Sequence, residues 1–336
     1  MSSNVLLEIR DLTKWYPART TGFIEGLFHE QKYLRAVDGV SVDIREGEIL
    51  GLAGQSGCGK STFGELLAML TKPTDGEILY DGQDITTFSK DEMKEYKRKC
   101  QIIFQDPYES LNPRFSVGRI VREPLVIHGI GDKEERDERV NRALSDAGLK
   151  PPESFIEQLP SELSGGQRQR VSIARALVLE PDFLIADEPV SMLDVSISTG
   201  ILNLFKKLQA ERNLTIVYIS HDLGTIDYLA DRTAIMYLGN LVELGPTNEV
   251  VYESAHPYTD MLLSAMPNPY LAIEREDVAM GDVPDAIDLP SGCRFRPDCA
   301  YATEKCARSE PPLRNIDEEQ LTACFYPING KEYPGE

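Results

Sequence analysis

The sequence predicts an α/β fold in which helices cover a largely parallel sheet. Apolar, strand-like runs alternate with segments of helical periodicity along most of the chain. The strand-like run "EILGLA" leads into a glycine-rich turn and a helical segment, and the run "FLIADEP" ends in two carboxylates. Open α/β sheets bind ligands at the carboxyl ends of their strands, so both features indicate a ligand site at that edge.

Composition and charge limit the class of protein. The 336 residues, of which 41% are apolar, can bury a sizeable core in one large or two medium domains. A formal net charge of −20 disfavours a surface for nucleic acid or anionic lipid, because such surfaces cluster Lys and Arg. No window approaches about 18 uninterrupted apolar residues, and the start lacks signal-peptide features. We expect a soluble cytoplasmic protein, whose cysteines are free, metal-bound or redox-active rather than disulfide-bonded.

Strand patterning dominates the first part of the chain. Residues 6–17, "LLEIRDLTKWYP", open with alternating apolar residues, as an edge strand does, and residues 35–54 resume this pattern. Residues 18–34 interrupt it, and we interpret them as a loop or excursion.

The pattern changes twice in the rest of the chain. From about 125 to 160 the periodicity is helical and the charge dense, which predicts an inserted helical subdomain. A β/α pattern returns at 183–189 and 215–222. Residues 234–245, "AIMYLGNLVELG", predict a hairpin that turns near Gly239-Asn240.

The first motif with chemical content is "GLAGQSGCGKST" at 51–62, which contains G-x-x-x-x-G-K-S from Gly54 to Ser61. It lies between an apolar strand and a helical segment, as a phosphate-binding loop (P-loop) requires. Backbone N–H groups of such a loop surround phosphate oxygens and the helix N-terminus adds a favourable dipole. Lys60 would reach the β- and γ-phosphates, and the hydroxyl of Ser61 would ligate Mg²⁺. An ordinary glycine-rich turn is the simpler alternative.

The second motif is "IADEP", in which an apolar strand ends in Asp187 and Glu188. Carboxylates at the carboxyl end of a buried strand lie where open α/β sheets bind ligands. Asp187 can hold the Mg²⁺ shell, and Glu188 can polarise an attacking water. An isolated Asp-Glu pair is more often a solvated turn, but a P-loop in the same chain favours the metal-and-base interpretation.

The third motif is "LSGGQRQRVSIARALVLEP" at 163–181, which places Ser164, Gly165 and Gly166 at the start of an amphipathic helix. Such an N-terminus offers a hydroxyl and free N–H groups, so it is a candidate for a second phosphate-binding surface. A helix merely capped by serine is the alternative.

Together these motifs resemble the motif set of the ATP-binding cassette (ABC) ATPases. "GQSGCGKST", "LSGGQ", "FLIADEP", "SMLD" and the histidine of "YISHD" stand in that family's order. The resemblance implies a P-loop NTPase (RecA-like) core with an antiparallel β subdomain, an α-helical subdomain inserted at about 106–165, and a small cysteine-containing C-terminal extension. We expect a nucleotide-binding domain over 1–255 and the extension over 256–336.

The resemblance also implies roles for individual residues. Gln105 of "IIFQDP" would be the Q-loop glutamine that senses Mg²⁺ and the attacking water, so Ser61, Gln105 and Asp187 are the expected Mg²⁺ ligands. Asp194 would be the D-loop aspartate and His221 the switch histidine at the γ-phosphate. The implied catalytic residues are Glu188, His221, Lys60 and Gln105.

The adenine ring of ATP would stack on an aromatic side chain, for which Tyr16 is the expected residue and Trp15 its close rival. An aromatic residue that only packs an edge strand is the alternative. The full implied set of nucleotide-binding residues is Tyr16, Gly54, Gln55, Ser56, Gly57, Cys58, Gly59, Lys60, Ser61, Thr62, Gln105, Ser164, Gly165, Gly166, Gln167, Asp187, Asp194 and His221.

Further segments resemble one branch of that family. "RAVDGVSVDI", "IIFQDPYESLNPR", "PVSMLDVSI" and "HPYTDMLLSAMP" are similar to the oligopeptide/dipeptide importers, in particular to the F-type member of their paired D-type and F-type ATPases. This implies head-to-tail pairing with a second ABC ATPase subunit (D-type, or a homodimer), two membrane permeases and an extracytoplasmic binding protein. The chain would sit peripherally at the cytoplasmic face of the membrane.

Other functions stay open at this point. Importers of this type also take up oligosaccharides or nickel. A soluble cassette ATPase acting on nucleic acid or ribosomes would carry a long coiled-coil insertion or two cassettes in one chain, and neither occurs in this sequence. A catalytically silent binding module would lack Glu188 or His221, and both are present.

The chain has six cysteines, and four of them lie in its last part. Cys58 and Cys100 are expected to be small apolar packing residues. The other four have 5, 6 and 17 residues between neighbours, without the close pairs that structural zinc usually uses: Cys293, Cys299, Cys306 and Cys324. Four thiolates can hold a [4Fe-4S] cluster, and the resemblance to the peptide importers favours one. Zinc and unmetallated thiols are the alternatives, and a bound metal would staple the tail.

Overall fold

The computed structural model describes residues 4–18, 31–265 and 286–333. Most of the loop predicted for residues 18–34 falls outside these ranges. The described residues form two compact units. The helical unit is Met1–Asn4, Arg45–Ile49 and Thr87–Ile219, and the P-loop unit is Val5–Ile44, Leu50–Thr86 and Ser220–Glu336.

The elements of the helical unit run in chain order from α2 to β8, the strand that precedes His221. They are α2 Lys90–Lys99, β6 Cys100–Ile103, α3 Pro107–Ser110, α4 Val117–His128, α5 Lys133–Asp146, the 3₁₀ turns Pro152–Ser154 and Pro160–Glu162, α6 Gly165–Leu177, β7 Phe183–Asp187, α7 Val195–Arg212 and β8 Thr215–Ser220.

The P-loop unit combines the N-terminal strands with the last third of the chain. Its elements are β1 Val5–Pro17, β2 Tyr33–Arg45, β3 Ile49–Ala53, α1 Lys60–Leu67, β4 Asp75–Tyr80, β5 Gln83–Asp84, the 3₁₀ turns Ile85–Thr87 and Arg296–Asp298, α8 Leu223–Leu229, β9 Arg232–Tyr237, β10 Asn240–Pro246, α9 Thr247–Tyr252, α10 Pro257–Ser264, α11 Glu304–Arg308, β11 Arg314–Asn315 and β12 Leu321–Thr322.

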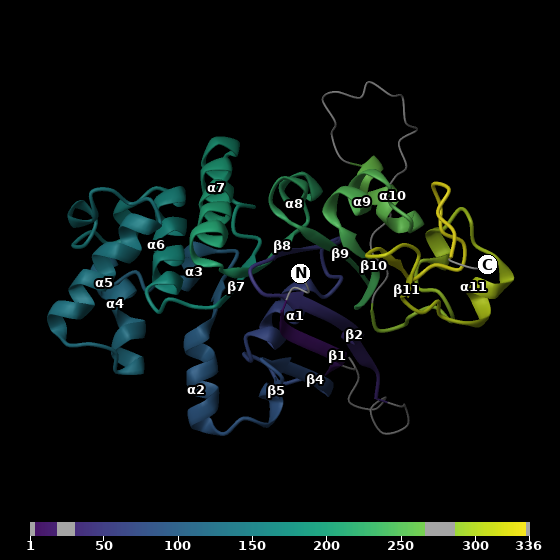
Figure 1. The fold of residues 1–336 in the computed structure, drawn as a ribbon, viewed down its shortest axis with the longest axis horizontal. Coiled ribbons are helices and arrows are strands. Elements are labelled where there is room, and N and C mark those ends of the chain that lie inside the picture. Colours follow the sequence, from purple (N-terminus) through teal and green to yellow (C-terminus); the bar gives the residue numbers. More distant parts are fainter. Residues whose placement is uncertain (1–3, 19–30, 266–285, 334–336) are drawn as a thin grey trace, which may run out of the picture. The chain divides into compact units, whose positions relative to one another are not determined.

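Parallel strands form the sheet of the helical unit. β7 pairs in parallel with β6 on one side and β8 on the other, and every residue of β7 and β8 is buried. Because these strands are covered on both faces, they are continuous apolar runs rather than alternating ones. Helices α4, α5 and α6 pack side by side (Figure 1). α4 and α5 overlap the stretch from about 125 to 160 where helical periodicity was predicted, and α6 is the helix predicted to begin at the "LSGGQ" motif.

The P-loop unit holds two patterns of strand pairing. One sheet has the order β2-β1-β4-β5, with antiparallel pairing of β1 with β4 and of β4 with β5. In the other, β3 and β9 are parallel, whereas β10 runs antiparallel to both β9 and β12, and β12 to β11. The strand arrangement is therefore more mixed than the largely parallel sheet that the sequence predicts.

The predicted hairpin is present. β9 and β10 pair from Tyr237↔Asn240 to Arg232↔Pro246, so the turn is at Leu238-Gly239, one residue before the expected position. Among the residues that the structure describes, no helix combines the length and the hydropathy needed to cross a membrane.

The C-terminal segment docks on this hairpin through a buried carboxylate. Glu243 of β10 is fully buried and accepts hydrogen bonds from the backbone N–H groups of Ala255 at 2.7 Å and His256 at 3.1 Å. The side-chain amide of Gln320, just before β12, donates to the same carboxylate at 2.9 Å. Burial without a cationic partner among these groups raises the pKa of the Glu243 carboxyl to about 7.

This carboxyl predicts a pH dependence of stability. Its pKa is about 7 in the folded chain against the ordinary 4.5, so the folded state holds a proton that the unfolded state releases. The free energy of unfolding should therefore fall as pH rises from about 5 to about 8, by up to roughly 3 kcal/mol. Glu243→Gln should remove this contribution to the pH dependence of the free energy of unfolding. Urea unfolding of wild type and variant over that pH range measures the difference. Equal slopes in the two proteins would contradict the assignment.

Candidate functional site: a P-loop, a carboxylate edge and a cysteine-lined cavity

The P-loop joins the buried strand β3 to α1, as the sequence predicts. Gly59 is the N-cap of α1 with φ of 111°, and a Cβ at this position would overlap the backbone carbonyl oxygen of Ala36. Only glycine allows this combination of left-handed backbone and close approach. The loop is therefore held against β2 by contact between backbones, which fixes the direction in which α1 begins.

Lys60 is folded into the loop. Its side chain is almost completely buried, and its ammonium donates to the carbonyl oxygens of Gly54 at 2.7 Å and Gln55 at 2.9 Å. The first N–H groups of α1 have no partner within the helix, so the loop presents donors beside a fixed cation. This is the arrangement that a polyphosphate requires.

The two cysteines expected to be packing residues are buried. Cys58 lies within the P-loop and is 1% exposed, and Cys100 at the start of β6 is 5% exposed. Burial raises the pKa of both thiols, for Cys100 to about 12. Both therefore stay protonated, as small apolar residues would require.

Two of the expected catalytic residues meet at the carboxylate edge of the helical unit. Gln105 follows β6, and Glu188 follows β7, so both stand at the carboxyl ends of neighbouring parallel strands. The Gln105 amide donates to Glu188 Oε2 at 3.0 Å and to Ser191 Oγ at 3.4 Å. Ser191 in turn donates to the Glu188 carbonyl oxygen at 3.0 Å. Asp187, the expected Mg²⁺ ligand, is 9% exposed at the end of β7.

The "LSGGQ" motif begins α6 through a capping box. The Ser164 hydroxyl accepts from the backbone N–H of Gln167 at 3.3 Å, and Gln167 Oε1 accepts from the Ser164 N–H at 2.8 Å. Gly166 packs on α7, where an added Cβ would lie 2.5 Å from Ile197 Cγ2, whereas at Gly165 it would lie 3.6 Å from its nearest neighbour. The motif thus fixes the start of α6 closely against α7.

Asp194 and His221 both stand at the boundary between an element and a loop. Asp194 is exposed and caps α7, since its Oδ1 accepts from the Ile197 N–H at 3.0 Å and the Ser196 hydroxyl at 3.1 Å. His221 is an exposed residue directly after β8. The capping bonds give Asp194 a structural role beside the one that the resemblance implies.

The two candidates for adenine stacking differ in their contacts. Trp15 donates its indole N–H to Asp38 at 2.8 Å, and the guanidinium of Arg35 lies 4.7 Å from its ring centroid. The Tyr16 ring has the Lys14 ammonium 5.0 Å from its centroid. Trp15 is thus engaged within the fold, and Tyr16 remains our prediction for stacking.

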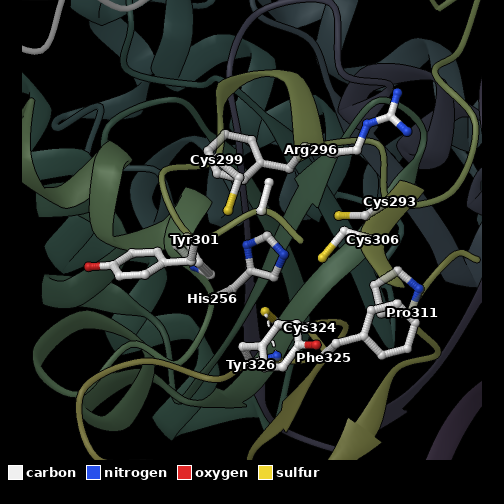
Figure 2. Close-up of a pocket in the computed structure, with 13 residues that line it drawn as sticks. His256, Cys293, Arg296, Cys299, Tyr301, Cys306, Pro311, Cys324, Phe325 and Tyr326 are labelled. Atoms are coloured by element: carbon white, nitrogen blue, oxygen red, sulfur yellow. Dashed lines mark hydrogen bonds between the residues drawn. The ribbon is translucent and has the colours of Figure 1, made fainter. Parts of the chain in front are cut away.

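The four C-terminal cysteines lie around one cavity. This cavity of about 10 Å³ is lined by all four thiols together with His256 and Phe295. Figure 2 shows the sulfur atoms of Cys293, Cys299, Cys306 and Cys324 turned toward it. Burial is the main cause that raises the pKa of Cys324 to about 12, and the thiols of the other three raise it further. The fold thus brings together residues that are up to 31 positions apart in the chain.

The donor set fits some metal groups better than others. Within the described residues, no three or more His, Cys, Asp or Glu side chains are arranged to hold a metal ion. Tetrahedral zinc needs ligands that converge on one point at about 2.3 Å. A [4Fe-4S] cluster is held by four thiolates, and four thiols line this cavity.

Sequence reasoning missed two residues that contact the nucleotide motifs. Ser191, within the "SMLD" segment, shares the Gln105 amide with Glu188. Tyr258, in α10, places its hydroxyl 3.1 Å from the backbone N of Gln55 in the P-loop. Both lie in segments that resemble the family, but the sequence assigned no contact to either, because Gln105 and Gln55 are far from them in the chain.

Comparisons with known proteins agree with these motifs. The family model described as ABC transporter matches residues 37–191, and the model described as oligopeptide/dipeptide transporter, C-terminal region, matches residues 242–306. A putative peptide import ATP-binding protein of Brucella ovis is 44% identical over 97% of this chain and 99% of its own length. The dipeptide transport ATP-binding protein DppF of Haemophilus influenzae is 42% identical over 96% of each chain.

A solved structure shares the cassette fold. The dimeric, post-hydrolysis structure of the ATP-binding cassette MJ0796 bound to ADP and Pi has a TM-score of 0.62 and 31% identity, over 72% of this chain and 98% of its own. The fold and site define an ABC-type ATPase. The chain belongs to the ATP-binding protein family of ABC transporters, in the branch with the oligopeptide/dipeptide transporter C-terminal region.

The contact between α6 and α7 yields a test with a matched control. In Gly166→Ala the new methyl group must displace the β-branched side chain of Ile197, so the free energy of unfolding should fall by about 1–3 kcal/mol. Gly165→Ala, next to it in the same helix turn, meets only an ordinary contact and should change stability by less than about 1 kcal/mol. Chemical denaturation of both variants measures the difference, and equal effects would contradict the packing described for Gly166.

Proposed function

We propose that this chain is the ATP-hydrolysing subunit of an ABC importer for di- and oligopeptides. The observation that carries the proposal is the P-loop, in which the buried ammonium of Lys60 lies at the N-terminus of α1. The peptide assignment is supported by the printed names of the relatives and by the matched C-terminal region.

The P-loop would bind the phosphates of ATP. Lys60 would exchange its bonds to the Gly54 and Gln55 carbonyls for the β- and γ-phosphate oxygens, while N–H groups of the loop and of α1 surround the chain of phosphates. Ser61, Gln105 and Asp187 would supply the oxygen ligands that Mg²⁺ prefers, and bound Mg²⁺ would supply neutralisation of the phosphate charge.

The carboxylate edge would direct the attacking water. Glu188 would accept its proton, and the amide of Gln105, bonded to Glu188 at 3.0 Å, would hold that carboxylate in place. His221 would contact the γ-phosphate. Negative charge that develops on the transferred group would be stabilised by Lys60 and by N–H groups at the start of α6 of a second, paired chain.

We further propose that two such chains pair head to tail. Ser164 and Gly166 of one chain would then face the P-loop of the other across ATP, and Asp194 would lie at that contact. The partner would be a D-type ATPase, or a second copy of this chain. Closure on ATP and opening after hydrolysis would drive two permeases, at the cytoplasmic face of the membrane, between access states that receive peptide from an extracytoplasmic binding protein.

For the tail we propose a [4Fe-4S] cluster on Cys293, Cys299, Cys306 and Cys324, within an extension over residues 256–336. The shared cavity of the four thiols supports it. Bound metal supplies folding energy to small segments that are poorly hydrophobic, so the cluster would hold the tail in one shape.

Hydrolysis is tested by Glu188→Gln, which keeps the size of the side chain and removes the base. We expect ATPase activity to fall by about 10²- to 10⁴-fold, while affinity for ATP stays within about threefold of wild type. Glu211→Gln, on the exposed face of α7, is the matched control and should leave the rate unchanged. Wild-type protein without Mg²⁺-dependent ATPase activity, or full activity in Glu188→Gln, would contradict the proposed mechanism.

The cluster is tested by anaerobic purification. The proposal expects brown protein with a broad absorbance in the visible blue, and loss of that colour in Cys299→Ser. Cys100→Ala, which removes a buried thiol outside the cavity, should keep the colour. Colourless protein that contains zinc, or no metal at all, would overturn the proposal.

A further inference from the structure

Tyr258 joins the C-terminal extension to the P-loop. It is fully buried in the first turn of α10, and its hydroxyl accepts a hydrogen bond from the Gln55 backbone N–H at 3.1 Å. The same hydroxyl lies 3.5 Å from the Gln55 side-chain oxygen, to which it can donate. One buried hydroxyl therefore contacts both the backbone and the side chain of the second residue of the motif.

The position of Tyr258 is fixed by its surroundings. Its ring lies 4.5 Å from that of Tyr237 and 5.4 Å from that of Phe295, and Tyr237 and Phe295 meet edge to face at 5.5 Å. Its backbone N–H donates to Nδ1 of His256 at 3.0 Å. Offset and edge-to-face ring pairs favour defined geometries, so the hydroxyl has little freedom to leave the loop.

The cysteine segment holds the same loop at a second point. Arg294, between Cys293 and Phe295, is buried and donates to the Leu238 carbonyl oxygen at 2.6 Å and to Asp38 at 2.8 Å. The neighbouring Gly239 N–H donates to the carbonyl oxygen of Cys58, inside the P-loop, at 2.9 Å. Contacts from the extension thus reach the P-loop near its start through Tyr258 and near its end through the β9–β10 turn.

We propose that Tyr258 is a positioning residue for ATP, by which the extension holds the P-loop in its phosphate-binding shape before the nucleotide arrives. A loop that is ordered beforehand pays less conformational entropy on binding, so the gain appears in affinity rather than in the chemical step. Tyr258 does not touch the reacting atoms. The inference rests on ATP binding at this loop, which the wild-type protein tests separately.

The test compares Tyr258→Phe with Tyr237→Phe. Both changes remove one buried hydroxyl from the same ring cluster, but the Tyr237 hydroxyl has no hydrogen-bond partner among the described residues, and so none in the P-loop. For Tyr258→Phe we expect the Kd for Mg-ATP, measured by titration calorimetry with the full chain, to rise by about 5- to 30-fold. The KM for ATP should rise in parallel while kcat changes by less than about twofold. Tyr237→Phe should match wild type in all three.

Hydrogen exchange gives a readout that does not depend on activity. Without nucleotide, the peptide that contains Gln55 should exchange at least about fivefold faster in Tyr258→Phe than in Tyr237→Phe. Unchanged affinity and exchange in Tyr258→Phe would overturn the inference, as would equal losses in both variants, which would mean that ring packing and not the hydroxyl matters. No ATP binding by the wild type would overturn the proposed function as well.

Discussion

The shape of the P-loop depends on contacts between backbone segments that lie too close together to leave room for a side chain. Gly59 stands against the carbonyl of Ala36, and the Cys58 carbonyl accepts from Gly239 of the β9–β10 turn. These contacts fix where α1 begins, and so where Lys60 and the free N–H groups of the helix lie. β2 and the hairpin must therefore be in place before the loop has its functional shape.

The C-terminal extension supports that same loop. It docks on β10 through β12 and the buried Glu243, and Arg294 ties it to Asp38 and the β9–β10 turn. Tyr258 then contacts Gln55 directly. Phe295 lines the cavity of the four cysteines, and its ring lies 5.4 Å from that of Tyr258. A metal group that orders the tail would therefore also order a neighbour of the P-loop contact.

The sequence predicted the features that depend on neighbouring residues. The P-loop between β3 and α1, the buried strand that ends at Asp187 and the β9–β10 hairpin have local signals of period and turn chemistry. The partners of Ser191 and Tyr258 are 86 and 203 positions away, so no local pattern could indicate them. The pairing of β10 with β12 and of β12 with β11 was missed, because β11 and β12 are strands of two residues each in the extension, whose sequence pattern is weak.

The most direct measurement is ATP-driven uptake of a labelled dipeptide by cells that carry this chain together with the permeases and the binding protein proposed as its partners. Lys60→Ala removes the cation that lies in the P-loop and leaves the glycines of the loop unchanged. We predict that cells with the wild-type chain take up the dipeptide, and that cells with Lys60→Ala take up no more than cells without the chain. Uptake that continues undiminished in Lys60→Ala would contradict an import driven by ATP at this loop.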